Sequence, residues 1–364
     1  MNESRLQKVR NNMASAGIEQ LLVVDPVSIM WLTGYYTEPF ERFLALLVPA
    51  KSSSDDSEPT LFANQLFPDP SDYVSRVVTF SDTDDPVSLV ATRTRHDLPL
   101  GVDKKLSARW LVPLMEVGAA SAFVLGSAAI DDARSVKDAR EQELMRIAST
   151  TNDKAMAWLA TQVRPGITER EVADALLDEY CRLGADDYSF TPIVSFGATA
   201  ADPHHEPDGT VFVPGDMVLF DVGCKQGGYC SDMTRTFFTA EPTEHQRTVY
   251  ETVRRANEAA EQAVQPGVTF AEIDRTARSI IEDAGWGPNF THRLGHQIGL
   301  EVHEPGDVSA AHTDPVQPGQ VFSIEPGIYL EGDVGVRIED LVIVTKDGCE
   351  VLNSYPKGIT VLEV

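Results

Sequence analysis

The sequence predicts two domains: a small α/β domain, residues 1–130, followed by an α+β domain, residues 131–364, that carries an internal duplication. A chain of 364 residues with 42% hydrophobic residues is long enough to form two cores. Helical and strand-like patterns alternate in the first third, as is typical of an α/β fold. In the remainder, the pattern V-x-P-G-x-T-x-x-E occurs twice, beginning at Val163 and at Val264.

The N-terminal domain begins with an amphipathic pattern over residues 3–16, which predicts a helix. Short runs of apolar residues predict buried strands at 20–24, 43–49 and 59–63. The acidic segment KSSSDDSE (51–58) between the last two is expected to be a loop. No part of this domain concentrates catalytic residue types, so we expect it to serve in dimerisation or as a lid.

Each copy of the repeat lies between two predicted helices. Thr168 with Glu171, and Thr269 with Glu272, have the spacing of a capping box, which starts the second helix of each pair. Strand-like segments follow in both copies. Two similar helix–helix–sheet halves predict a domain with pseudo-twofold symmetry.

The charge and hydropathy of the chain exclude two classes of partner. A net charge of −26 repels nucleic acid and anionic membrane surfaces. Apolar runs such as FLALLV (43–48) are too short to span a bilayer, and the start MNESRLQKVRNNM lacks the apolar core of a signal peptide. We therefore expect a cytoplasmic protein. Both a well-solvated acidic surface and adaptation to a salt-rich cytoplasm fit the charge.

The cysteines show neither a zinc-ribbon nor a disulfide pattern, because none forms a C-x-x-C pair. We expect reduced and mostly buried thiols at Cys181, Cys224, Cys230 and Cys349.

Two aspartates fall in VLFDVGCKQGGYCSDMTRTFF (218–238), a segment that predicts a β-hairpin with a glycine-rich turn. A turn at Gln226-Gly227 would place Asp221 directly opposite Asp232, whereas a turn at Gly227-Gly228 would make the pair diagonal. Like charges that face each other destabilise a sheet, and a bound cation would compensate for them.

Two glutamates repeat this arrangement in VFSIEPGIYLEGDVGVRIEDLVIV (321–344), which also predicts a hairpin. A three-residue loop centred on Gly332 places Glu325 opposite Glu339. Both hairpins, one in each half, carry a facing pair of acids. A chance arrangement of solvent-exposed acids explains this repetition poorly.

Three histidines lie in HRLGHQIGLEVHE (292–304), where two glycines make an extended segment at least as well favoured as a helix. His296 is the candidate ligand, with His292 and His303 nearby, and ADPHHEP (201–207) could add an imidazole from the first half. Four carboxylates with one imidazole favour manganese, iron or cobalt over a structural zinc, and such a set can hold two metals.

With DVGCKQGGYCSDMTRT, HRLGHQIGLEVHE, SIEPGIY and GVRIED in this order, the chain resembles the pita-bread metallopeptidases, and among them the Xaa-Pro peptidases (prolidase and aminopeptidase P). The resemblance covers nearly the whole chain and includes an N-terminal domain like that of creatinase and prolidase. It implies a pita-bread catalytic domain that binds two divalent metal ions, most simply Mn²⁺. The matching ligand positions are Asp221, Asp232, His296, Glu325 and Glu339.

The resemblance also implies roles for these ligands. Asp221 would bind one metal through both oxygens, Asp232 and Glu339 would bridge the pair, and His296 and Glu325 would complete the second metal. A hydroxide that bridges the two metals would attack the scissile carbonyl. Glu325 would also carry a proton near that hydroxide.

Further residues match positions that contact the substrate in this family. His204, preferred over the adjacent His205, would steady the tetrahedral intermediate, and His303 would donate a hydrogen bond to it. His292 would help bind the proline side of the substrate. Arg337 matches an arginine close to the last bridging glutamate, and a strand-edge ion pair is compatible with that position.

The implied function is a homodimeric Xaa-Pro dipeptidase acting on Xaa-Pro dipeptides or short proline-containing peptides. An Xaa-Pro aminopeptidase acting on longer peptides is the nearest alternative, because the same metal site serves both. Methionine aminopeptidases generally lack such an N-terminal domain, and creatinase-like hydrolases do not keep the ligand set. A non-catalytic pita-bread binding protein is a further alternative, which failure to bind divalent metal would favour.

Overall fold

The computed structural model describes residues 1–50 and 58–364. These residues divide into two compact units, Met1–Arg134 and Ser135–Val364. This division and the predicted boundary after residue 130 both fall within helix α5 (Ala128–Ser135). Residues 51–57, which contain most of the predicted KSSSDDSE loop, lie outside the described ranges.

The first unit is built on one mixed sheet with the strand order β4-β3-β2-β1-β5-β6. Its strands are β1 (Gln20–Val23), β2 (Leu44–Pro49), β3 (Thr60–Asn64), β4 (Val77–Phe80), β5 (Pro99–Val102) and β6 (Ala122–Leu125). Its other helices are α1 (Glu3–Ser15), α2 (Pro26–Thr33), α3 (Pro86–Ala91) and α4 (Ala108–Glu116).

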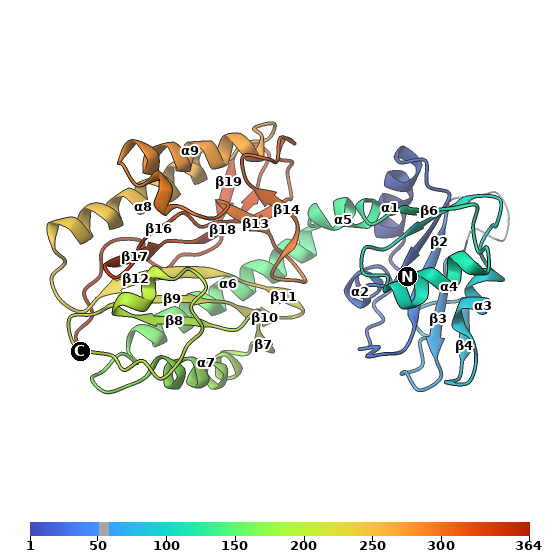
Figure 1. Ribbon diagram of the computed structural model, residues 1–364, viewed down its shortest axis with the longest axis horizontal. Helices are drawn as coiled ribbons and strands as arrows, with labels where there is room; N and C mark the ends of the chain where they lie inside the picture. The colour runs from blue at the N-terminus through green and yellow to red at the C-terminus, as the bar shows by residue number, and fades with distance from the viewer. Residues whose placement is uncertain (51–57) are drawn as a thin grey trace. The chain divides into compact units, whose positions relative to one another are not determined.

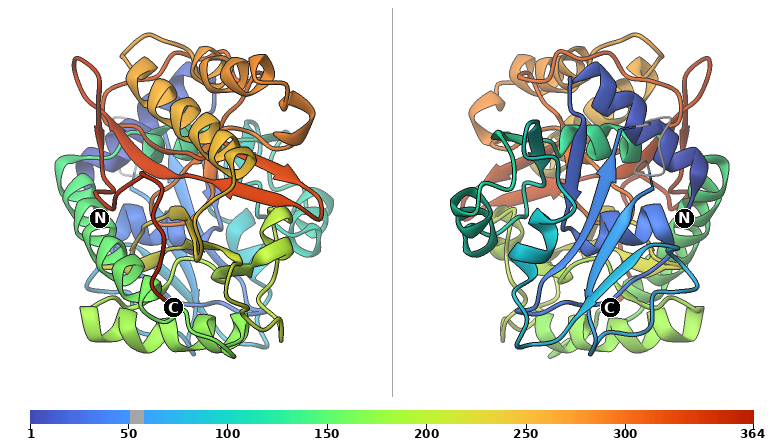
Figure 2. Two further views of the ribbon diagram at one scale, coloured as in Figure 1. Left: turned by 90° about the vertical axis from the view of Figure 1, so that its left-hand side faces the viewer. Right: turned by 90° about the vertical axis from the view of Figure 1, so that its right-hand side faces the viewer.

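Successive side chains along each strand of this sheet point to opposite faces, because side chains repeat every two residues along a strand. Leu22, Ala45 and Phe62 share an apolar core with residues of α3 and α4. The strands run through the centre of the unit in blue in the right-hand view of Figure 2, and α1 lies on the side away from α3 in Figure 1. The α/β architecture predicted for this domain is confirmed.

The second unit contains two similar halves. The first half comprises α6 (Ala139–Ala160), α7 (Glu169–Leu183), β7 (Asp187–Tyr188), β8 (Ile193–Phe196), η2 (Gly197–Ala201), β9 (Met217–Val222), β10 (Cys224–Gln226), β11 (Tyr229–Cys230) and β12 (Met233–Phe238). The second comprises α8 (Glu244–Ala263), α9 (Phe270–Asp283), η3 (Gly287–Asn289), β13 (Gly295–Gln297), β14 (Glu304–Val308), β15 (Val321–Ile324), β16 (Gly327–Leu330), β17 (Val334–Arg337), β18 (Asp340–Val344) and β19 (Cys349–Val351).

The two halves share the same helix caps and the same strand order. Both predicted capping boxes are present, at Thr168 with Glu171 and at Thr269 with Glu272. The strands also repeat their order, because β12-β9-β8 in the first half corresponds to β18-β15-β13 within the five-stranded sheet of the second. The predicted duplication is therefore present in the fold.

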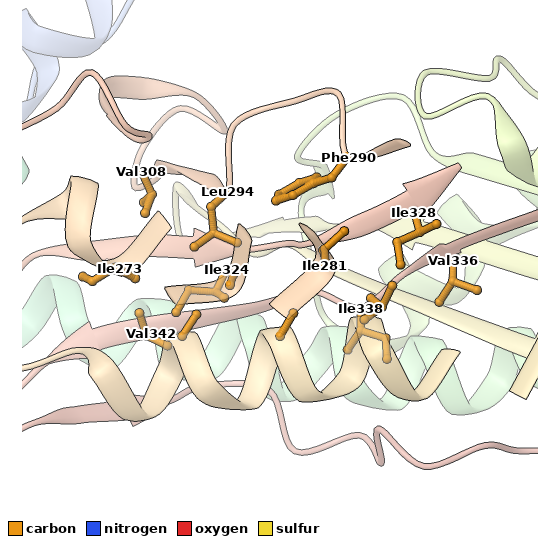
Figure 3. Packing of buried hydrophobic residues seen from close by; sticks show 14 of the residues in the cluster. Ile273, Ile281, Phe290, Leu294, Val308, Ile324, Ile328, Val336, Ile338 and Val342 are labelled. Atoms are coloured by element: carbon orange, nitrogen blue, oxygen red, sulfur yellow. The ribbon is translucent and has the colours of Figure 1, made fainter. Parts of the chain in front are cut away.

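Each half uses its own helices to cover one face of its strands. In Figure 1, α7 lies below the strands of this unit and α8 and α9 lie above them, while α6 runs diagonally behind the strands of the first half. Phe220 and Val222 of β9 pack in a core with residues of α6 and α7. Ile324 and Ile338 pack in a second core with residues of α8 and α9, as Figure 3 shows. Because side chains alternate along a strand, the intervening Asp221 faces away from its own helices, toward the other half.

No helix in residues 1–50 and 58–364 is both long enough and apolar enough to cross a membrane.

Candidate metal centre

The first acidic hairpin turns at Gly227-Gly228, so the register with Asp221 directly opposite Asp232 is wrong. Asp221 pairs with Thr234 across β9 and β12, and Asp232 lies diagonally, as the alternative turn requires. Gly227 and Gly228 have φ values of 58° and 86°. A two-residue hairpin turn with positive φ at both central positions favours glycine at both, which excludes Gln226 as a turn residue.

The second acidic hairpin has the predicted register. Gly327 pairs with Arg337 in the β16–β17 ribbon, and Ile324 pairs with Asp340 where β15 meets β18. The ladder is interrupted between these two pairs, and this is where Glu325 and Glu339 lie. The interruption frees both acids from regular pairing and leaves their carboxylates close to the first hairpin.

The histidine segment is extended around His296, which lies in β13, so the helical alternative is wrong. A side chain at the preceding Gly295 would place its Cβ 1.9 Å from the carbonyl oxygen of Ser323, so only glycine permits this close approach. The His296 Nε2 atom lies 3.7 Å from Asp232 Oδ2 and 3.6 Å from Glu325 Oε1. The histidine therefore joins the acids of both hairpins.

All five predicted ligands line one cavity of about 410 Å³ within the second unit. Ligand atoms of Asp232, His296 and Glu339 lie within 4.8 Å of one another, close enough to share a metal ion. The cavity is also lined by the other predicted site residues, by apolar side chains and by one further arginine: His204, His292, His303, Arg337, Phe190, Ile193, Pro203, Val302 and Arg293. The structure thus brings together every residue that the sequence nominated for the site.

The acids of this cluster cannot all ionise easily without a compensating cation. Burial, reinforced by the carboxylate of Glu339, raises the pKa of Asp232 well above its usual range. Burial likewise raises the pKa of Glu339 well above its usual range, with the carboxylate of Glu325 adding to the shift. Burial raises the pKa of Glu325 to about 7. Neutralising such a cluster is what a bound divalent cation does.

Burial favours the neutral form of three histidines in this cavity. Burial lowers the pKa of His296 to about 3 and that of His292 to about 4. Burial also lowers the pKa of His303, whose ring meets that of His296 edge-on with 4.3 Å between ring centroids. A neutral imidazole has the free lone pair that a metal ligand needs.

Two buried carboxylate oxygens support a metal site directly. Asp221 Oδ1 and Asp232 Oδ1 are buried, and neither has a hydrogen-bond partner among the residues that the structure describes. A buried oxygen of this kind is costly unless something coordinates it. The donor set of four carboxylates and one imidazole suits a divalent metal of the manganese, iron or cobalt type, so the residues present fit such an ion.

Arg337 connects the two halves at the edge of this cluster. Its Nη2 donates to Asp221 Oδ2 over 2.6 Å, and its Nε donates to Thr234 Oγ1 over 3.0 Å. Its Nη1 donates to the Tyr329 hydroxyl over 2.9 Å, and that hydroxyl also lies 2.9 Å from His292 Nε2. Arg337, predicted as a substrate contact, is therefore also an internal partner of a ligand.

Tyr329 and Thr234 were not nominated from the sequence. Tyr329 had a usable signal, because Glu325, Gly327 and Tyr329 alternate on one face of a strand pattern. Gly327 leaves room for the phenol, since a Cβ there would lie 2.3 Å from the Tyr329 oxygen. Thr234 Oγ1 donates to Glu339 Oε2 over 2.7 Å, a contact between halves that no local pattern indicates.

The neighbouring histidines of ADPHHEP have different surroundings. His204 lines the cavity. His205 instead points to the start of α7, where its Nε2 lies 2.6 Å from Glu169 Oε2. The other oxygen of Glu169 accepts hydrogen bonds from the Phe196 amide and the Thr199 hydroxyl. The Glu169–His205 pair thus anchors the loop that carries His204.

Comparisons with known proteins identify the family of this chain. The family model of metallopeptidase family M24 matches residues 143–346, and that of the creatinase/prolidase N-terminal domain matches residues 5–136. A putative dipeptidase, YkvY, from Bacillus subtilis is 35% identical over 99% of this chain and 100% of its own length.

Solved structures have the same two-domain architecture. Dipeptidase PepE from Mycobacterium ulcerans has a TM-score of 0.92 at 33% identity, covering 100% of this chain and 98% of its own. The prolidase from Thermococcus sibiricus has a TM-score of 0.91 at 32% identity, covering 100% of this chain and 99% of its own. The chain therefore belongs to metallopeptidase family M24 and is a metal-dependent peptidase with a creatinase/prolidase-type N-terminal domain and a pita-bread catalytic domain.

Proposed function

We propose that this chain is an Xaa-Pro dipeptidase that works with two divalent metal ions, Mn²⁺ by preference. The observation that carries the proposal is the convergence of five metal-ligand candidates and three further histidines on one cavity. Relatives described as a dipeptidase and a prolidase support the substrate class.

The proposed ligands divide into three sets. Asp221 would hold one metal, His296 and Glu325 would hold the other, and Asp232 and Glu339 would contribute to both. The tight grouping of ligand atoms from Asp232, His296 and Glu339 supports a central position for the two acids proposed to contribute to both. When bound, the metals lower the pKa of water and polarise a carbonyl, which makes amide hydrolysis feasible at neutral pH.

The side chains around the metals would orient the substrate and move protons. Glu325, whose carboxylate lines the cavity, would accept a proton from the attacking water and return it to the leaving nitrogen. His204 and His303, at the cavity wall, would donate hydrogen bonds to the developing oxyanion. His292, held by Tyr329, would contact the proline side of the substrate, as would Arg337.

The shape of proline suits this kind of cavity. The Xaa-Pro bond has no N–H, and the ring fixes φ, so a protease that grips an extended backbone handles it poorly. Phe190, Ile193 and Val302 provide apolar surface on the cavity wall that could hold a pyrrolidine ring. A rigid ring held in this way would keep the scissile carbonyl near the metals.

The direct test is cleavage of Ala-Pro and of Ala-Pro-Ala by Mn²⁺-loaded protein, with products followed by chromatography. Cleavage of the dipeptide alone supports the dipeptidase, whereas release of alanine from the tripeptide favours an Xaa-Pro aminopeptidase. Asp232→Asn should abolish activity, and Asp314→Asn, which alters a side chain 83% exposed, should not. Inactivity on both peptides, or an active Asp232→Asn variant, would refute the mechanism.

Three further parts of the proposal concern the whole molecule. We propose a cytoplasmic homodimer whose catalytic domain begins near residue 131. The free cysteines support a reducing compartment, because none of the described cysteines is in a disulfide. Size-exclusion chromatography with light scattering would test the dimer.

A further inference from the structure

A buried asparagine on α8 lies behind the two ligand glutamates. Asn257 is fully buried, and its Nδ2 donates to the carbonyl of Ile324 over 2.9 Å and to that of Ile338 over 3.3 Å. Ile324 directly precedes Glu325, and Ile338 directly precedes Glu339. One amide therefore contacts the backbone beside both glutamates.

These two carbonyls lie where the strand ladder is interrupted. β15 ends at Ile324 and β18 begins at Asp340, and the β16–β17 ribbon resumes only at Gly327 and Arg337. A buried carbonyl without a partner destabilises a fold. The side-chain amide of Asn257 replaces the missing backbone donor at both strands and joins them at the position where the ligands leave the sheet.

Lys357 fixes the orientation of this amide on the side that faces away from the two strands. The Asn257 Oδ1 accepts from Lys357 Nζ over 2.7 Å, and Lys357 also pairs with Glu261 over 2.5 Å and with Asp340 over 2.7 Å. Because the ammonium can only donate, the amide oxygen must face Lys357 and the NH₂ group must face the strands. The asparagine is thereby locked in the orientation that serves both carbonyls.

The first half contains a corresponding buried asparagine. Asn152 of α6 is fully buried, its Nδ2 donates to the carbonyl of Val222 over 2.8 Å, and its Oδ1 accepts from the Tyr180 hydroxyl over 2.7 Å. Val222 directly follows Asp221. Asn152 and Asn257 occupy the same place in their helices, 13 residues after the first residue in each case (152 − 139 and 257 − 244).

We propose that Asn152 and Asn257 are a pseudo-symmetric pair of positioning residues that hold the ligand-bearing strands in the geometry needed for metal binding. Asn257 positions Glu325 and Glu339, and Asn152 positions Asp221. Neither is among the described residues that line the cavity. The inference rests on the ligand assignment proposed above. Residues that orient metal ligands typically change metal affinity by about 10–100-fold when altered, and we expect a loss of this size.

The test compares Asn257→Ala and Asn257→Asp with the matched control Thr252→Ala. The buried Thr252 hydroxyl lies on the same helix but bonds only to the carbonyl of Thr248, one turn earlier. Asn257→Asp keeps the shape and the acceptor for Lys357 but presents oxygen to the two strand carbonyls. Mn²⁺ affinity of chelator-stripped protein would be measured by calorimetry, and the visible spectrum of the Co²⁺-loaded protein would report ligand geometry.

The expected result is that both Asn257 variants bind Mn²⁺ at least about tenfold more weakly and alter the Co²⁺ spectrum, whereas Thr252→Ala matches the wild type. Asn152→Asp should show the same direction of change. Wild-type affinity in Asn257→Asp would overturn the proposal, because only the contact to Lys357 would then matter. If both Asn257 variants unfold while Thr252→Ala folds, the role is in folding and the proposal is also overturned.

The experiment distinguishes failure of this positioning role from failure of the proposed ligand assignment. If Asp232→Asn binds Mn²⁺ as tightly as the wild type, the assigned ligands are wrong. If Asp232→Asn loses metal but both Asn257 variants retain it with an unchanged spectrum, the ligands stand and the positioning role falls.

Discussion

Arg337 and Asp221 form a buried ion pair between the two halves of the catalytic domain, with Nη2 of the arginine 2.6 Å from Oδ2 of the aspartate. Their side chains are only 3% and 12% exposed. The arginine occupies one carboxylate oxygen, and the other, Oδ1, has no hydrogen-bond partner within residues 1–50 and 58–364. The pair therefore fixes the direction of a proposed metal ligand and links β17 to β9.

Replacing Arg337 by Met should weaken Mn²⁺ binding and activity by about 10–100-fold, because Asp221 loses the group that orients it. Arg337→Lys should recover little of this, since a compact ammonium lacks the planar fork by which three separate nitrogens of the guanidinium reach Asp221, Thr234 and Tyr329. Calorimetric Mn²⁺ titration and dipeptide kinetics would measure both effects. Arg146→Met removes a bidentate pair with Glu350 at a more exposed site and is the matched control. Equal effects at the two arginines would contradict the assignment.

The stability of the metal-free protein should fall as pH rises above about 7, because below that pH the lowered pKa values of His292, His296 and His303 act in the opposite direction. Burial raises the pKa of Glu325 to about 7 and those of Asp232 and Glu339 well above the usual range. The folded chain therefore holds protons that the unfolded chain releases above its ordinary carboxyl pKa values. Stability from these groups is present at low pH and is lost as pH rises through the folded pKa values.

Urea unfolding with excess chelator at several pH values would measure this slope. Asp232→Asn should flatten it, because the asparagine needs no proton to remain neutral. Saturating Mn²⁺ should raise stability most at the higher pH, since metal binding requires deprotonated ligands. A metal-free protein that becomes more stable between pH 7 and 9 would argue against the charge cluster.

His204 and His205 should differ sharply when each is replaced by Ala. His204→Ala should lower kcat by about 10²–10³-fold, the loss expected when one donor to a developing oxyanion is removed. His205→Ala should act mainly on stability, because it breaks the bond to buried Glu169. Steady-state kinetics at saturating Mn²⁺, together with thermal unfolding, would separate the two. A larger kcat loss at His205 would reverse the assignment.

A single cysteine should react rapidly with a disulfide reagent at pH 8. Burial raises the pKa of Cys224 and Cys349 to about 11 and that of Cys230 to about 12, so their reactive thiolates are scarce. Cys181 is exposed. Titration with a chromogenic disulfide should show one fast equivalent that Cys181→Ser removes, and denaturant should expose the others. Two or more fast thiols in the native protein would contradict this burial.

Local patterns in the sequence predicted much of the fold because they depend on neighbouring residues alone. The capping boxes at Thr168 and Thr269 are set by side chains three residues apart, which any helix start brings together. The register around Gly332 also followed from turn length and strand period. The first hairpin shows the limit of this reasoning, since the placement of the turn at Gly227-Gly228 depended on which residues adopt positive φ.

The sequence by itself determined the types and order of the candidate ligands, because their spacing on strands follows the period of two. Only the tertiary structure decided which distant groups meet: Arg337 with Asp221, His205 with Glu169, and Asn257 with two strand carbonyls. These contacts join residues from separate helices and hairpins, so their geometry depends on how the layers pack. Side-chain periodicity fixes which face of its own element a residue occupies, but the partner that this face meets is fixed only by packing.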